Sequence, residues 1–142
     1  MSQISELELA ANRCNQWLYN IALPIWSEVG FDKQYGGFTE RLDINGNPID
    51  VGFKRTRVTG RQIFVFCQAY RAGHEQYEAL IERGIDFLLR YQKGDNIGSW
   101  RRTVLTSGAK LDDTIDLYDY AFVLFGLAWC CLLYTSDAAD DT

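Results

Sequence analysis

Four cationic side chains fall within eight residues of the sequence: Lys54, Arg55, Arg57 and Arg61. Such groups can hold an anion or stabilise negative charge that develops during a reaction. An arginine is a permanent cation with a planar fork of donors, so it can stabilise an oxyanion but cannot remove a proton. Lys54, Arg55 and Arg57 could form a small anion patch, although these charges are too few to predict nucleic-acid binding.

Proton transfer needs a base, and the sequence offers few candidates. The single histidine, His74, falls in the segment 71–75, which we expect to be an exposed loop at a helix end. The acidic residues that could serve instead are Glu40, Asp43, Asp112 and Asp116. Nothing around them indicates the raised pKa that a catalytic carboxyl group needs near neutral pH. Asp112 and Asp113 are adjacent, so they do not face each other as the paired carboxylates of a glycoside hydrolase must.

The four cysteines indicate neither a metal site nor a disulfide framework. They lie at positions 14, 67, 130 and 131 and form no C-x-x-C pair. Because zinc sites need clustered ligands, we expect no metal site, and no cofactor is indicated. Cysteines within apolar helical patterns are usually buried free thiols, which predicts a reducing cytoplasm.

Charge and hydropathy limit the expected partners. The net charge of -5 argues against nucleic acid as the main partner. The first six residues contain neither the basic nor the apolar region of a secretory signal. The longest apolar run, 121–133, is shorter than the roughly 20 residues that span a bilayer. We therefore predict a buried helix there and no membrane partner.

Hydrophobic spacing predicts four helices that would position these side chains, at about 4–29, 58–72, 76–93 and 116–129. Pro24 should interrupt the first helix. The first and third helices are amphipathic, whereas the second and fourth are apolar on every side, which is typical of helices that are buried all round. Two layers of helices would produce this alternation, with outer helices facing water and inner helices covered by neighbours.

Short hairpins are expected before each inner helix, near residues 38–53 and 100–111. The segments from Gly36 and from Gly98 resemble each other, with a second glycine ten positions later in both and an offset of 62 between them. One such hairpin–helix unit cannot bury its own inner helix, so units must stack. Two units do not obviously close a ring, and we therefore expect the chain to be incomplete.

The last twelve residues, 131–142, do not continue the helical pattern. The codons TGT CTC TTA TAC ACA TCT would encode Cys131–Ser136, and they lie within a transposase end sequence used to build sequencing libraries. The acidic residues that follow match the continuation of such an adapter. We therefore predict that residues 1–130 are a truncated part of one domain and that 131–142 is a translated adapter rather than native protein.

Three segments together resemble the N-acylglucosamine 2-epimerase family of sugar epimerases and isomerases. The first joins Leu23–Trp26 to Gly36–Asp43, the second is Arg57–Phe66, and the third is Asp116–Leu124. Each segment alone is weak, but their order and spacing make the match fairly specific. The resemblance implies an all-α fold, the N-terminal part of an (α/α)6 barrel with short hairpins between its helices. Full-length members are nearly three times as long as this chain.

The resemblance also implies a reaction. A histidine removes the proton at C2 of an open-chain aldose, an enediolate forms, and a proton returns to C2 or to C1. The first outcome is epimerisation and the second is isomerisation to a ketose. The catalytic histidines would lie outside this chain, so we expect the chain itself to be inactive. A small sugar is the implied partner, and the full-length parent is expected to be a homodimer.

The implied site residues are Arg61, Tyr118, Arg57 and Asp116. Arg61 matches the arginine that contacts the sugar oxygen, the alternative being an ion pair at a helix start. Tyr118 matches a pocket tyrosine, the alternative being a core aromatic. Arg57 could share the site or could be solvated or paired, and Asp116 lies where relatives vary. At Tyr120 many relatives carry histidine, so the role of that position stays open.

Two other classes of function remain as alternatives. One is a glycoside hydrolase on the same (α/α)6 barrel, which needs two facing carboxylates. The other is a non-enzymatic helical-repeat module that binds partners and would not need Arg61. If the chain is incomplete, its inner helices would expose large apolar faces that favour association.

Overall fold

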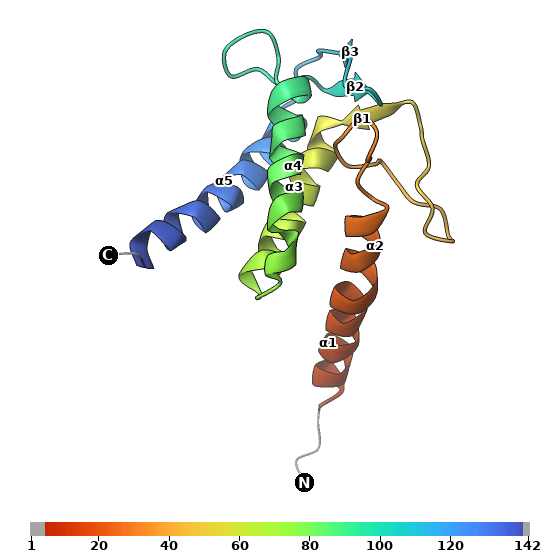
Figure 1. Cartoon of the computed structure of the whole chain (residues 1–142), viewed down its shortest axis with the longest axis vertical. Coiled ribbons are helices and arrows are strands. Elements are labelled where there is room, and N and C mark those ends of the chain that lie inside the picture. Colours follow the sequence, from red (N-terminus) through yellow and green to blue (C-terminus); the bar gives the residue numbers. More distant parts are fainter. Residues whose placement is uncertain (1–4, 141–142) are drawn as a thin grey trace.

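The computed structural model describes residues 5–140, and the protein is mostly helical with one small sheet (Figure 1). The elements, in chain order, are α1 (Glu6–Trp17), η1 (Leu18–Ala22), α2 (Leu23–Glu28), β1 (Phe53–Arg55), α3 (Thr56–Arg71), η2 (Glu75–Tyr77), α4 (Glu78–Phe87), η3 (Leu88–Gln92), β2 (Thr103–Leu105), β3 (Lys110–Asp112) and α5 (Leu117–Asp140).

The first helix begins with a capping box and contains the predicted interruption at Pro24. The Ser5 side chain accepts from the Glu8 N–H, and the Glu8 carboxylate accepts from the Ser5 N–H. Pro24 has no N–H to continue the α-helical pattern. The chain instead passes through the π-turn η1, in which the Leu23 N–H donates to the Leu18 carbonyl, before α2 starts. No residue of α1 is buried, so the apolar face predicted for it stays uncovered within this chain.

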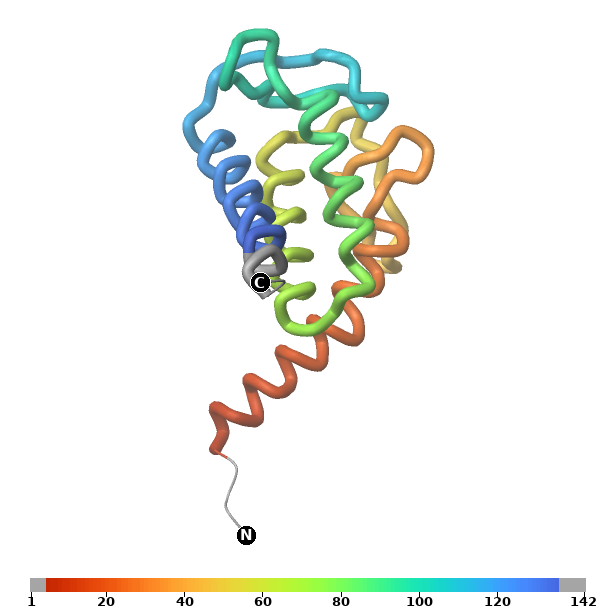
Figure 2. The backbone as a smooth tube through the Cα atoms, turned by 60° about the vertical axis from the view of Figure 1, so that its left-hand side comes forward, coloured from red at the N-terminus to blue at the C-terminus, as the bar shows by residue number. Residues whose placement is uncertain are grey.

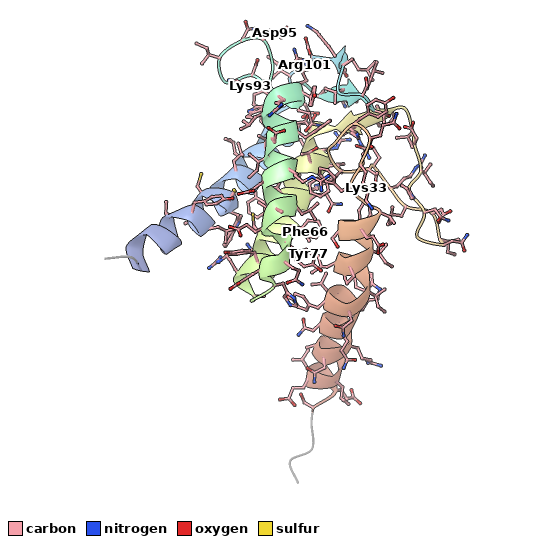
Figure 3. The ribbon with its side chains drawn as sticks, viewed as in Figure 1. Lys33, Phe66, Tyr77, Lys93, Asp95 and Arg101 are labelled. Atoms are coloured by element: carbon pink, nitrogen blue, oxygen red, sulfur yellow. The ribbon has the colours of Figure 1, made fainter. Side chains whose placement is uncertain are left out.

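The helix α3 is the centre of the fold, as its all-apolar sequence predicts. It lies between α4 and α5, and the sheet and the long loops sit at its N-terminal end (Figure 2). None of its residues before Arg71 is exposed. Phe66 of α3 packs against Tyr77, with ring centroids 5.1 Å apart, where the chain turns into α4 (Figure 3). The predicted helix 76–93 is found as η2, α4 and η3, with its apolar face on α3.

The two inner helices, α3 and α5, touch through their backbones. A Cβ atom added to Gly60 would overlap the Phe122 carbonyl, and one added to Gly126 would overlap the Gly60 carbonyl. Glycine is therefore required at both positions for this crossing. The contact lies about one turn into α3 and nearer the middle of α5, and it fixes how closely the two helices approach each other.

The helix α5 differs from the predictions in two ways. It continues to Asp140, so the prediction that residues from 131 onward leave the helix is wrong as far as the described residues reach, while 141–142 lie outside them. It is also covered on one side only, because Val123 and Cys130 are buried whereas Leu124 and Phe125 are exposed.

The length of α5 also affects the membrane prediction. In the described part of the chain, Leu117–Thr135 is long and apolar enough to cross a membrane by length and composition alone. The prediction that the apolar run is too short is therefore wrong, since the helix extends beyond that run. Core helices of globular proteins satisfy the same criterion, and α5 packs along α3.

The sheet is formed by residues from both predicted hairpins. The second hairpin is confirmed, since β2 and β3 pair antiparallel. The first is wrong as a two-stranded hairpin, because residues 38–50 pair with one another only in the bridge between Leu42 and Pro48, while Phe38 pairs with Phe31. The following residues form β1, which pairs with β2 some fifty positions later, with Lys54 opposite Val104. The partner that stabilises β1 is thus supplied by the second hairpin rather than the first.

The predicted repeat is confirmed by the backbone pairings. The bridge between Phe31 and Phe38 has its equivalent, 62 positions later, in the bridge between Lys93 and Trp100. The bridge between Leu42 and Pro48 corresponds in the same way to the pairing of Val104 with Lys110. We therefore define the first unit as residues 31–71, which ends with α3, and the second unit as residues 93–133, which ends within α5.

Candidate functional site

The N-terminal ends of α3 and α5 bring together the residues predicted to bind substrate. Arg61, in the second turn of α3, donates from Nη2 to the Tyr118 hydroxyl of α5 over 2.5 Å. The two residues are 57 positions apart in sequence. The packing of α3 against α5 is therefore what creates the pair.

Arg61 carries a charge that no carboxylate neutralises within residues 5–135. Its guanidinium carbon lies 4.0 Å from the Phe122 ring centroid and 5.4 Å from that of Tyr118. The alternative reading of Arg61, an ion pair at the helix start, is not observed in this part of the chain. A cation that is held by ring faces and one neutral hydroxyl keeps N–H groups available for an oxygen-rich ligand.

Arg57 forms an ion pair, which is one of the alternatives that the sequence left open for it. Its Nη1 lies 2.9 Å from the Oδ1 of Asp119, a carboxylate that is only 1% exposed. Arg102 approaches the other oxygen of Asp119 at 3.9 Å. Asp119 was missed as a candidate, although an acidic residue inside an apolar run is a signal in itself, because buried charges need partners.

Asp116 and Tyr120 have structural contacts. Asp116 accepts from the Tyr118 N–H over 2.9 Å, which caps the start of α5 and orients the backbone that carries the site tyrosine. The Tyr120 hydroxyl accepts from the Trp100 N–H over 3.0 Å and so ties α5 to the loop before β2. Asp116 therefore lies beside the candidate site and acts on it through Tyr118.

The anion patch predicted from Lys54, Arg55 and Arg57 does not form. Arg55 pairs with the nearly buried Glu40 at 2.6 Å. Lys54 is buried and donates to Asp32 at 2.7 Å and to two backbone carbonyls. The prediction is wrong because Lys54, Arg55 and Arg57 each pair with a carboxylate from a distant segment. Of the four cations in the segment 54–61, only Arg61 lacks such a partner among the described residues.

A cavity of about 440 Å³ lies beside the Lys54–Asp32 pair, away from Arg61. It is formed by the end of α2, the loop after it, and the segment that leads into β1. Burial alone would raise the pKa of Asp32, but hydrogen bonds from Lys54 and from the N–H groups of Tyr35 and Gln34 outweigh it and lower that pKa. Neither Arg61 nor Tyr118 lines this cavity, so it is separate from the predicted site.

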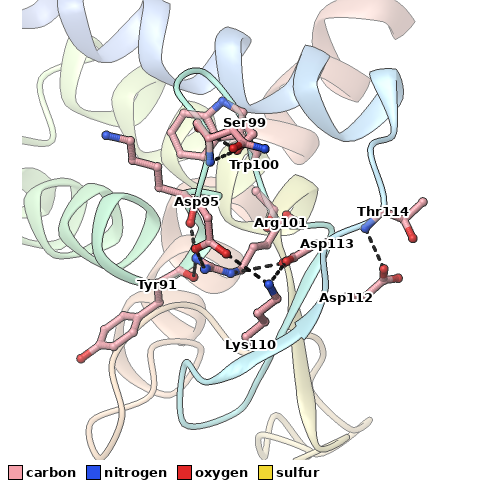
Figure 4. Close-up of polar contacts among 12 residues, drawn as sticks. Tyr91, Asp95, Ser99, Trp100, Arg101, Lys110, Asp112, Asp113 and Thr114 are labelled. Atoms are coloured by element: carbon pink, nitrogen blue, oxygen red, sulfur yellow. Dashed lines mark hydrogen bonds and ion pairs between the residues drawn. The ribbon is translucent and has the colours of Figure 1, made fainter.

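The adjacent carboxylates Asp112 and Asp113 do not form a glycosidase pair (Figure 4). Hydrogen bonds from Thr114 hold the pKa of Asp112 below its ordinary value. Asp113 forms ion pairs with Lys110 and Arg101. Neither group resembles the protonated acid that glycoside hydrolysis needs, so the described residues give this alternative no support.

His74 lies in the predicted helix-end loop, but the prediction that it is exposed there is wrong. Its ring stacks on Tyr19 at 4.5 Å between centroids and is half-buried. This contact joins the end of α3 to η1, which is a structural role. Among the described residues, no group of three or more histidines, cysteines, aspartates or glutamates could hold a metal ion.

Comparisons with known proteins give a consistent result. The profile of the family described as N-acylglucosamine 2-epimerase (GlcNAc 2-epimerase) matches residues 36–141. The mannose-6-phosphate isomerase of Rhizobium meliloti (strain 1021) is 33% identical over 124 residues, which is 87% of this chain and 32% of that protein.

Solved structures agree with the profile. The cellobiose 2-epimerase of Spirochaeta thermophila DSM 6192 superposes with a TM-score of 0.78 at 22% identity, covering 87% of this chain and 30% of that one. The cellobiose 2-epimerase of Bacillus thermoamylovorans B4167 gives 0.78 at 24% identity, covering 92% and 34%. A D-mannose isomerase gives 0.71 at 24% identity, covering 82% and 29%. These neighbours confirm the predicted fold class. This chain spans about a third of the length of their chains.

Proposed function

We propose, from the premise that this chain belongs to the N-acylglucosamine 2-epimerase family of sugar epimerases and isomerases, that Arg61 and Tyr118 form one wall of a site for an open-chain aldose. The reaction we propose for the longer protein is proton transfer at C2. In this reading the chain supplies the group that stabilises the developing oxyanion, and later units supply the bases.

The observation that carries the proposal is the surroundings of Arg61. It is the one cation near the N-terminal ends of the inner helices that has no carboxylate partner in the described part of the chain. Tyr118 fixes one of its terminal nitrogens at 2.5 Å. A guanidinium that is oriented but not neutralised is suited to an oxygen that becomes negative during the reaction.

The proposed step balances as follows. A base removes the proton from C2, and the electron pair of that C–H bond forms the enediolate while the carbonyl oxygen at C1 becomes negative. Arg61 faces this oxygen. Return of a proton to the opposite face of C2 regenerates an epimeric aldose. Return of a proton to C1 gives the ketose, provided that the O2 hydroxyl passes its proton to O1 so that the carbonyl forms at C2.

The base is the part that this chain does not provide. His74 follows the C-terminal end of α3, and the ten residues from Arg61 to Arg71 alone span about 15 Å along the helix. The pKa of Asp43 is lowered by hydrogen bonds from Asn47, and that of Asp112 by those from Thr114. We therefore propose that the 142-residue chain alone catalyses no conversion.

Deuterium exchange at C2 in heavy water tests the proposal, with mannose, glucose, N-acetylmannosamine, cellobiose and mannose 6-phosphate as substrates. A longer chain, read past Trp129 in the genomic locus, should exchange at least one of them, whereas this chain should exchange none. In the longer chain, Arg61→Ala should lower turnover by about 10²-fold, the scale of one lost oxyanion-stabilising donor. Unchanged turnover would remove Arg61 from the site.

We also propose a small sugar as the partner and a reducing cytoplasm as the location, without a nucleic-acid or membrane partner. The free thiols of Cys67 and Cys130 and the net negative charge support this reading. The packing of α5 on α3 favours its role as a core helix over a membrane span.

A further inference from the structure

Asp119 is a buried carboxylate in the first turn of α5, next to the site residue Tyr118. Its Oδ1 lies 2.9 Å from Nη1 of Arg57, which is itself mostly covered. Its Oδ2 is also buried and has no hydrogen bond among the described residues, with Arg102 3.9 Å away from it. Because this chain already encloses the carboxylate, its surroundings do not depend on residues that would cover the exposed side of α5.

The ion pair between Arg57 and Asp119 is a weak source of stability. Removing two charges from water costs more than their attraction returns unless both are fully hydrogen-bonded, and one oxygen of Asp119 has no donor among the described residues. An uncharged pair of similar size would fill the same space at lower cost. Stability alone therefore leaves a charged pair beside the site unexplained, and its effect on neighbouring side chains offers an explanation.

Two arginines of α3 are within reach of the same aromatic side chain. Arg57 and Arg61 are four residues apart, so they lie on one face of the helix, where like charges repel. Their guanidinium carbons are 5.9 Å and 5.4 Å from the centroid of the Tyr118 ring. Tyr118 has a single hydroxyl, which accepts from Arg61. Arg57 instead donates to Asp119, which neutralises it.

We propose that Asp119 is a positioning residue for the sugar site. By binding and neutralising Arg57, it leaves the Tyr118 hydroxyl and the unneutralised charge to Arg61. The position of Arg61 matters because a stabilising donor works best when it already points at the oxygen that becomes negative. Asp119 acts through Arg57 rather than by contacting the sugar. The inference rests on the proposed function for its effect on turnover, whereas its effect on the contact between Arg61 and Tyr118 can be measured without a substrate.

The contact between Arg61 and Tyr118 gives the first test, which needs no activity. In the longer chain labelled with 15N-arginine, the Arg61 side-chain signal is the one that disappears in Arg61→Lys. Asp119→Asn keeps the shape of the side chain but removes its charge, so Arg57 becomes free to compete for the Tyr118 hydroxyl. We expect this variant to shift the Arg61 signal in the same direction as Tyr118→Phe does.

Removing the competing cation should reverse the shift. When Arg57→Met is added to Asp119→Asn, no second guanidinium is left beside the ring, and the Arg61 signal should return to its position in the unmodified chain. An Arg61 signal that Asp119→Asn leaves in place would overturn the proposal, and so would a shift that Arg57→Met does not reverse.

Turnover gives the second test, on the sugar that the longer chain exchanges fastest. Asp119→Asn should lower kcat about 5- to 10-fold and change KM less than about twofold, because the donor that it misdirects acts mainly in the transition state. Adding Tyr118→Phe should then lower kcat by less than about a further twofold, because both changes remove the same hydrogen bond. If Asp119→Asn lowered kcat by the same factor with and without the Tyr118 hydroxyl, Asp119 would be a residue of the fold alone and the proposal would be refuted.

Asp86→Asn is the matched control, because Asp86 pairs with Arg90 on the exposed surface. The same loss of one carboxylate there should change neither kcat nor the Arg61 signal. Urea midpoints show which variants are folded, and Asp119→Ser takes the place of Asp119→Asn in both tests if the asparagine variant does not fold. If the longer chain exchanges none of the sugars, the proposed function fails, and the Arg61 signal alone decides the role of Asp119.

Discussion

Lys54 and Arg61 lie seven residues apart in the sequence, and the structure gives them opposite surroundings. Lys54 is buried in the middle of β1, where Asp32 and the carbonyls of Gly36 and Thr106 take all three of its donors. Arg61 lies one turn past the start of α3, half-buried, with ring faces and one hydroxyl as its partners among the described residues.

The difference separates a charge that holds the fold together from a charge that is available to a ligand. Lys54 joins the loop after α2, β1 and the turn after β2, three segments that no other single side chain among the described residues connects by such bonds. The hydrogen-bond and ring partners of Arg61 among the described residues, Tyr118 and Phe122, both lie on α5. The number of segments that a cation connects, rather than its type or its position in the sequence, indicates which role it has.

The largest loss of stability should come from removing the Lys54 ammonium group. Lys54→Met leaves Asp32 and two carbonyls without their buried donor, and we expect it to lower the free energy of unfolding by about 3 kcal/mol or more. Arg61→Ala, the matched change, should lower it by less than about 1 kcal/mol. Urea unfolding followed by circular dichroism, at one fixed protein concentration, measures both. Equal losses would erase the distinction between the two cations.

Low pH should weaken the ion pair between Lys54 and Asp32, because it protonates the Asp32 carboxylate. The pKa of Asp32 is lower in the folded chain than its usual value of about 3.9, so between these two pKa values the unfolded chain binds the proton more readily. The contribution of Asp32 to stability is therefore present above about pH 4 and is lost as the pH falls through the folded pKa. Urea midpoints measured from pH 7 to pH 3 should fall more steeply for the unmodified chain than for Asp32→Asn, and parallel profiles would contradict this.

The role of Arg61 can be tested by removing only the hydroxyl group that orients it. Tyr118→Phe keeps the ring beside Arg61 and removes the hydroxyl that orients it. In the longer, active chain we expect turnover to fall about 5- to 10-fold, on the order of 1 kcal/mol, with little change in the urea midpoint. A lower midpoint without a change in turnover would make Tyr118 a packing residue, the alternative that the sequence left open.

The smallest effect is expected at His74. His74→Ala removes the stacking on Tyr19 and should lower the free energy of unfolding by about 0.5–1 kcal/mol. His74→Phe preserves the stack and serves as the control. Neither change should alter C2 exchange in the longer chain, and a loss of exchange that both share would show that the imidazole takes part in the chemistry.

Local patterns predicted the helices well because each carries its own periodicity. The apolar spacing along 58–72 and 76–93 depends on neighbours three and four residues away, and both helices appear close to the predicted positions. The pairing of β1 with β2 was missed because its two strands lie on different units. The continuation of α5 to Asp140 was missed because the hydrophobic spacing of the inner helix does not extend into these residues, and spacing was the signal used to set the helix end.

The candidate site was predicted in part for the same reason. Arg61 and Tyr118 followed from the family resemblance, and the structure places them in contact. The partners of the other cations could not be predicted locally, since Asp32 is 22 residues from Lys54 and Asp119 is 62 residues from Arg57. Which charges are neutralised depends on packing between distant segments, and the false anion patch arose from reading neighbours in sequence as neighbours in space.

The backbone contact between Gly60 and Gly126 affects how the site can change over evolution. Since α3 and α5 meet main chain to main chain at Gly60 and Gly126, the distance between the two helices at this crossing does not depend on the size of the side chains around it. Exposed side chains of α5 such as Leu124 can therefore be substituted while Arg61 keeps its contacts with Tyr118 and Phe122. The glycines thus separate the spacing of the two helices, which must stay constant to keep Arg61 beside Tyr118, from the surrounding exposed side chains, which are free to diverge.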